Sequence, residues 1–323
     1  MPAYRAPLRD MHFVFDEVLD AYATLQTLPS QHEFGNDLGG AILEEAAKLA
    51  ENVLAPLNAS GDQQGCQYDP QTKTVKVPDG FRSAYQQFAQ GGWTALACEP
   101  EFGGQGLPHV LNMMVEEMVC SANLSLGMYP GLTHGAINAL TAHGTRSQQA
   151  QYLPKLISGE WTGTMCLTEP QCGTDLGLIR TRALPSADGS YAISGTKIWI
   201  TGGEHDLADN IVHLVLAKLP DAPDSVKGIS LFLVPKFLAC GTRNSAFCGG
   251  LEHKMGIKGS ATCVMNFESA QGWLIGEPNK GMRCMFTMMN SARLMVGMQG
   301  LGIAENAYQI SLGFARERLQ GRA

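Results

Sequence analysis

The stretch MCLTEPQCGTD, residues 165–175, decides the fold of this chain. It ends in a turn rich in Gly, Thr and Asp, whose backbone N–H groups and hydroxyls can face a phosphate or the polar edge of a ring. The stretch GTKIWITGG, residues 195–203, predicts a strand, because β-branched and aromatic residues lie between turn residues. A strand that ends in Trp-Ile-Thr holds a large flat side chain and a hydroxyl at a fixed separation, which suits a planar heterocycle. Either stretch taken alone also fits an ordinary β-hairpin with a capping threonine.

In this order, the two stretches resemble the flavin-contacting segments of the acyl-CoA dehydrogenase family. They resemble most the long subfamily with an N-terminal extension, which includes methylmercaptopropionyl-CoA and broad-range linear acyl-CoA dehydrogenases. Four further stretches resemble other parts of the family. Residues 4–11 resemble the N-terminal extension, and residues 100–106 a loop between N-terminal helices. Residues 253–263 resemble the last strands of the middle domain, and residues 313–322 the first long helix of the C-terminal domain.

Composition is compatible with this resemblance and excludes other classes. The 323 residues, with 45% hydrophobic and 16% charged side chains, leave room for two or more domains. A formal net charge of -7 offers no basic face for nucleic acid. Acidic residues interrupt the N-terminal segment, and no later apolar run approaches the ~20 residues of a membrane span. Nine cysteines without zinc spacing and without a preceding secretory segment predict reduced thiols in a cytoplasmic protein.

Two common motifs for other chemistry are missing from the sequence. The HExxH pattern fails at His32-Glu33 because the fifth residue is Asn36, so a zinc hydrolase is excluded and we expect no metal site. No GxGxxG motif follows a strand and opens a helix, so FAD would not be held in the Rossmann manner.

The spacing of apolar residues changes twice along the chain. It is helical in the first part, as at Phe13, Val14 and Val18, then short and alternating from Trp161 onward, and helical again after Gly281. Together with the resemblance, this predicts an α+β fold with an N-terminal α-helical domain, a middle antiparallel β-domain and the first helix of a C-terminal helical bundle. The expected boundaries are residues 1–34 for the extension, 35–160 for the helical domain, 161–275 for the β-domain and 276–323 for the incomplete C-terminal domain.

The last helical stretch carries two apolar stripes, one through Val296 and Phe314 and the other through Leu294 and Tyr308. A helix that is apolar on two faces needs partners on both sides. The resemblance places those partner helices and much of the oligomer interface beyond this stretch, so we expect a homo-oligomer in a longer, full-length form. With its stripes bare, the chain as given would aggregate, self-associate or pair with another polypeptide.

The resemblance implies bound FAD, which carries the redox step while the protein orients it. The first stretch would offer backbone groups and a hydroxyl to the flavin ring, and the second would flank the isoalloxazine. Arg318 would reach the FAD pyrophosphate of a neighbouring subunit, because a guanidinium forks onto phosphate oxygens; a solvated pair with Glu317 is the alternative. The implied cofactor-binding residues are Met165, Leu167, Thr168, Thr174, Trp199, Ile200, Thr201 and Arg318.

The resemblance also implies contacts to an acyl-CoA substrate. Thr174 would sit between the FAD pyrophosphate and the acyl-CoA, while Asn290 and Arg293 would lie near the CoA moiety. Family members often carry Asp at the position of Asn290. The Asn of this chain keeps the hydrogen bonding of that Asp and loses its negative charge. Arg293 pairing inside the helical bundle is an equal alternative. For His134, which falls where the family's helices line the acyl pocket, a packed helix histidine is the favoured interpretation over a substrate contact.

The implied reaction is α,β-dehydrogenation of an acyl-CoA thioester to the trans-2-enoyl-CoA, with electrons passed to an electron-transfer flavoprotein. The catalytic Glu is expected beyond the end of the chain. In the position that a minority of the family uses, the chain has Ala292, so no catalytic residue is assigned. Two alternatives are an acyl-CoA oxidase or flavin monooxygenase, distinguished by fast reoxidation by oxygen, and an inactive remnant or interaction protein.

Overall fold

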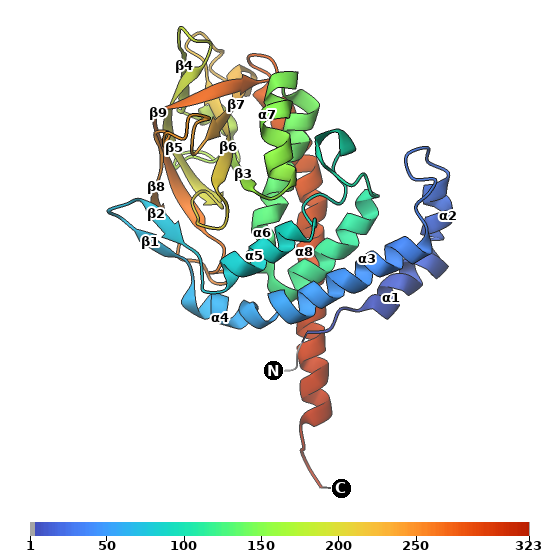
Figure 1. The fold of residues 1–323 in the computed structure, drawn as a ribbon. Helices are drawn as coiled ribbons and strands as arrows, with labels where there is room; N and C mark the ends of the chain where they lie inside the picture. The colour runs from blue at the N-terminus through green and yellow to red at the C-terminus, as the bar shows by residue number, and fades with distance from the viewer. Residues whose placement is uncertain (1–3, 323) are drawn as a thin grey trace.

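The computed structural model describes residues 4–322, and the chain runs through helices, a β-domain and one long C-terminal helix. Figure 1 shows the helices beside the β-domain, with the last helix passing alongside them and projecting beyond the rest of the molecule. The helical part comprises α1 (Leu8–His12), η1 (Phe13–Val18), α2 (Ala21–Gln26), α3 (Asn36–Leu49), η2 (Ala50–Leu54), α4 (Pro56–Gln64), α5 (Phe81–Gln90), η3 (Pro100–Phe102), α6 (His109–His143) and α7 (Arg146–Ile157), with a small hairpin of β1 (Gln67–Asp69) and β2 (Thr74–Lys76).

Helix α6 changes direction at Asn123, whose φ of -159° and ψ of 87° are not helical. The Asn123 Oδ1 accepts a hydrogen bond from the backbone N–H of Leu126 at 3.1 Å, and its Nδ2 donates to the carbonyl of Leu54 at 3.2 Å. Asn is a preferred residue for this capping role, since its side chain replaces a missing intrahelical partner. The helix therefore has a first limb, residues 109–122, and a second limb, residues 124–143.

The β-domain is built from β3 to β9, whose hydrogen-bonded order is β3-β6-β4-β5-β9-β7, with β8 on β9. Strand β7 also pairs with β6, so the path from β6 through β4, β5, β9 and β7 closes on β6, with β3 outside it, and encloses a core of buried apolar side chains. The bounds are β3 (Trp161–Cys166), η4 (Leu176–Leu178), β4 (Arg182–Pro185), β5 (Tyr191–Thr201), β6 (Asn210–Lys218), η5 (Val226–Gly228), β7 (Ile229–Pro235), β8 (Ala246–Leu251) and β9 (Thr262–Ile275).

Three details differ from the sequence-based expectations. The sheet is not antiparallel throughout, because β3 and β6 pair in parallel; the β4–β5 hairpin lies between them in the chain and supplies the long crossover that parallel strands need. Residues 253–260 form a connection before β9 rather than a strand, with Ile257 at a φ of 47°. Phe13, Val14 and Val18 lie on exposed positions, while Met11 and Phe15 are buried in their place.

The last helix, α8 (Gly281–Glu317), packs along both limbs of α6. Gly302 lies so close to the first limb that a Cβ there would come within 2.9 Å of the Cβ of Cys120. Met288 fills the space beside Gly135 of the second limb. The other faces of α8 are bare, including most apolar residues of the two predicted stripes: Leu294, Val296, Leu301, Ile303, Tyr308 and Phe314 are more than half exposed. None of the helices within residues 4–322 is both long enough and apolar enough to span a membrane.

Candidate functional site

The two stretches that resemble flavin-contacting segments lie side by side. The Nζ of Lys197 donates to the carbonyl of Leu167 at 2.9 Å, and the backbone N–H of Ile198 donates to the carbonyl of Thr168 at 2.9 Å. These contacts tie the end of β3 and its turn to the middle of β5. Residues that are thirty positions apart in the chain therefore form one surface.

A buried ion pair holds this surface together. The Lys197 Nζ lies 2.8 Å from Glu169 Oε1, and both side chains are almost fully shielded from water. Glu169 also accepts hydrogen bonds from the backbone N–H groups of Arg180 and Thr181 and from the Thr181 hydroxyl. Burial alone would raise the pKa of Glu169, but the charge of Lys197 and these hydrogen bonds outweigh it and lower the pKa to about 2. The pair thus stays ionised and fixes the 168–181 loop against β5.

The predicted flat side chain, Trp199, is presented outward by a bulge. The register of β5 against β9 shifts between Lys197 and Ile200, and Trp199 within this bulge has a φ of 60°, which is strained for a residue with a side chain. As a result Trp199 is 60% exposed while Ile200 points into the buried core of the β-domain. An exposed indole held in a strained conformation is a surface that a planar ligand can cover.

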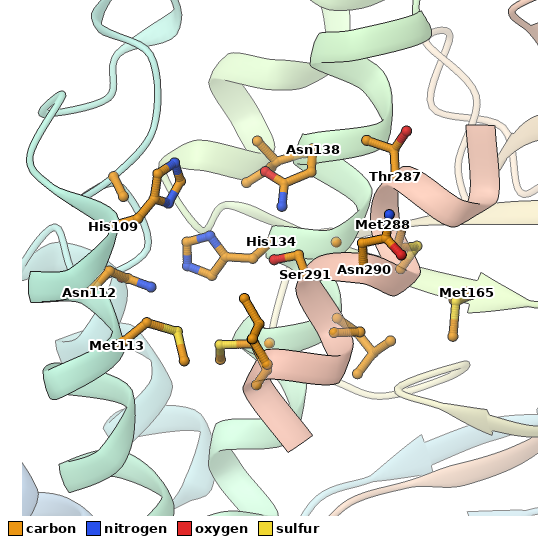
Figure 2. Close-up of a pocket in the computed structure, with 18 of the residues that line it drawn as sticks. His109, Asn112, Met113, His134, Asn138, Met165, Thr287, Met288, Asn290 and Ser291 are labelled. Carbon is orange, nitrogen blue, oxygen red and sulfur yellow. The ribbon is translucent and has the colours of Figure 1, made fainter. Parts of the chain in front are cut away.

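A cavity of about 770 Å³ opens beside this surface, between both limbs of α6 and the first half of α8. It is lined by Met165 of β3, Thr201 of β5 and Asn290 of α8, so predicted residues from three elements meet at one site. Figure 2 shows Met165 at one end of the view and His109 with Asn112 at the other. Ala292 also lines the cavity; it occupies the position where a minority of the resembled family carries its catalytic Glu.

The remaining predicted residues lie around the cavity or away from it. Leu167 is buried, Thr168 is half-buried and Thr174 is exposed on its turn.

The exposed Arg293 donates to Asn290 Oδ1 at 2.9 Å, so it positions a residue of the cavity without lining it. Arg318 follows the end of α8 and lies over the ring of Phe314, outside the cavity. Its predicted role toward a neighbouring subunit therefore remains a prediction.

Two features of the site were missed from the sequence. The first is the ion pair between Glu169 and Lys197, two residues of the quoted stretches. A lysine inside an apolar strand is the signal that would have indicated a buried partner of opposite charge. The polar side chains His109, Asn112 and Asn138 of the cavity wall carry no such signal, because they come together only through the turn at Asn123.

Two family descriptions match the helical part and the β-domain of this chain. The family description "Acyl-CoA dehydrogenase, N-terminal domain" matches residues 40–160, and "Acyl-CoA dehydrogenase, middle domain" matches residues 164–270. The chain is 48% identical to a 3-methylmercaptopropionyl-CoA dehydrogenase of Ruegeria pomeroyi over 99% of this chain and 55% of that relative. The chain thus spans about half the length of this curated relative.

Two solved structures share the fold. One, titled as an electron transferring flavoprotein of Acidaminococcus fermentans, is 27% identical with a TM-score of 0.76, covering 89% of this chain and 71% of that one. The other, an acyl-CoA dehydrogenase of Bacillus anthracis complexed with FAD, is 27% identical with a TM-score of 0.74, covering 90% and 46%. The matched domains and the relative together show that this chain belongs to the acyl-CoA dehydrogenase family.

Proposed function

We propose that this chain binds FAD along residues 165–175 and 195–203 and binds an acyl-CoA thioester in the adjacent cavity. It would do so as part of a dehydrogenase that converts the thioester to the trans-2-enoyl-CoA and passes electrons to an electron-transferring flavoprotein. One observation carries this proposal: the same cavity is lined by Met165 and Thr201 from the two stretches and by Asn290 from α8. A bound flavin supplies the acceptor for the β-hydrogen, which leaves as hydride.

The protein's own contribution is to hold both ligands in a fixed relation. The Leu167 carbonyl is already engaged by Lys197, so its N–H is the backbone group that it can offer to a ring. Thr201 brings a hydroxyl to the cavity, and Trp199 provides an aromatic face beside it. Since the Glu169–Lys197 pair anchors both stretches, these groups are positioned before a ligand arrives, which is what binding and catalysis require.

The proton acceptor is not evident in this cavity. Among the described residues that line it, Glu99 is the one carboxylate, and it is exposed where the cavity meets a second hollow beside Glu101 and Arg146. Ala292 cannot accept a proton. We therefore propose that the α-proton is removed by a carboxylate other than those that line the described cavity.

The test is FAD binding by Trp199 variants. Tryptophan fluorescence and flavin absorbance of the purified chain, titrated with FAD, should report saturable binding. Trp199→Ala should weaken it about tenfold or more, because the largest aromatic contact is lost, while Trp199→Phe should keep most of it. Equal binding by both variants would contradict the proposed position of the ring.

A second measurement separates the dehydrogenase from its alternatives. Where acyl-CoA reduces the bound flavin, the proposal predicts faster reoxidation by electron-transferring flavoprotein than by oxygen. Faster reoxidation by oxygen would indicate an oxidase instead. Bound flavin that no acyl-CoA perturbs would indicate a non-catalytic flavin-binding chain.

A further inference from the structure

One end of the cavity is polar, although most of its wall is apolar. His109 and Asn112 come from the first limb of α6, and His134 and Asn138 from the second limb. Figure 2 shows the rings of His109 and His134 facing each other across the two limbs, with Asn112 and Asn138 beside them. We call these four residues the polar corner. Nearby parts of the wall are formed by methionines, among them Met113, Met128 and Met295.

The hydrogen-bonding groups of the polar corner are not satisfied by the protein. His134 Nε2 is shielded from water and has no hydrogen-bond partner within residues 4–322. Asn112 of the same wall is only 7% exposed. A buried polar group without a partner costs about 1–3 kcal/mol, so a residue of this kind in a cavity wall indicates a ligand that completes it.

The His134 side chain of the polar corner is neutral near neutral pH. Burial, and then the nearby His109, lower the pKa of His134 to about 4, so its imidazole is neutral and offers one N–H donor and one acceptor nitrogen. Within the described part of the chain, no Lys or Arg lines the cavity. A carboxylate or phosphate placed here would lose its hydration without gaining a lysine or arginine partner, whereas a hydroxyl would find both a donor and an acceptor at His134.

We infer that the polar corner selects acyl chains that carry a neutral hydrogen-bonding group, such as a hydroxyl, over plain alkyl chains of the same length. This inference rests on the proposed function, because it takes the cavity as the acyl site. It makes His134 a specificity-determining residue, with Asn112 and Asn138 as its neighbours. The methionines leave the approach to the corner adaptable, since their side chains are flexible.

The experiment measures binding of CoA thioesters by isothermal titration calorimetry, with FAD present. Straight-chain acyl-CoAs of increasing length are each compared with the ω-hydroxyacyl-CoA of the same chain. At the length that reaches the corner, the hydroxylated thioester should bind about tenfold more tightly, the size expected for one hydrogen bond to a buried group. His134→Leu should bring this ratio to about one.

Matched variants keep the result interpretable. His134→Gln, which keeps a donor and an acceptor, should retain the preference. If His134→Leu does not fold, Asn138→Leu provides the second test and should lower the ratio. Equal binding of both thioesters at every length would overturn this inference alone. Absence of binding by any acyl-CoA would overturn the proposed function as well.

Discussion

At the scale of single residues, the Glu169–Lys197 pair explains why two segments distant in sequence act as one surface. A lysine inside a strand and a glutamate in a turn are each costly to bury alone. Their mutual attraction and the five hydrogen bonds that the Glu169 carboxylate accepts offset this cost. The sequence placed both residues in the quoted stretches, but their pairing was not predicted, because nothing in the spacing reports that β5 runs past the turn after β3.

Glu169→Gln should therefore be strongly destabilising. It leaves the buried Lys197 without a counter-charge, which lowers the free energy of unfolding by about 3–5 kcal/mol. Urea denaturation followed by circular dichroism measures this change. The matched control is Glu160→Gln, which removes an exposed ion pair with Lys155 and should cost less than about 1 kcal/mol. A similar small cost for both variants would mean that the buried pair does not anchor the site.

The buried acid Glu116 predicts that the stability of the protein depends on pH. It is fully buried on α6 with Oε2 lacking a partner within the described chain, and burial raises its pKa from 4.5 to about 7. The folded protein then binds more protons than the unfolded chain between these values, so this group lowers stability as pH rises through the window. Glu116→Gln should stabilise the protein by about 2 kcal/mol more at about pH 8 than at about pH 5. An equal effect at both pH values, measured by urea denaturation, would contradict the buried acid.

At the scale of elements, alternation and resemblance were sufficient for strands such as β6 and β7, and helical spacing predicted that α8 starts at Gly281. The change of direction in α6 was not predicted, because residues on both sides of Asn123 keep helical spacing and the capping contact reaches Leu54, far away in the chain. For the same reason half of the candidate site was missed. The polar corner exists only once the two limbs of α6 lie together.

The packing of α8 on α6 gives a prediction with an internal control. Gly302→Ala would place a Cβ 2.9 Å from both the Cβ of Cys120 and the backbone N of Ser121, which should cost about 1–3 kcal/mol in unfolding free energy. Gly300→Ala, where a Cβ meets nothing within 4 Å, should instead stabilise the helix by about 1 kcal/mol. Thermal denaturation of the two variants decides the matter. Stabilisation by both would show that α8 does not pack on α6 as described.

At the scale of the whole molecule, the helices and the β-domain each supply one wall of the site, and α8 closes it. The proposed flavin-binding surface comes from the β-domain, the polar corner from α6 and the predicted CoA contact Asn290 from α8. The bare apolar residues of α8 show that the long helix offers more surface than residues 4–322 cover. The proposed binding of both ligands thus depends on the assembled domains, which no single motif in the sequence could establish.

The most direct measurement is the visible absorption spectrum of the purified chain loaded with FAD, recorded without oxygen before and after addition of butanoyl-CoA. If the flavin and the thioester share the site between Met165, Thr201 and Asn290, the bands of the bound flavin shift when the thioester is added. Failure to retain FAD, or a bound flavin whose spectrum does not change at saturating thioester, would contradict a shared site.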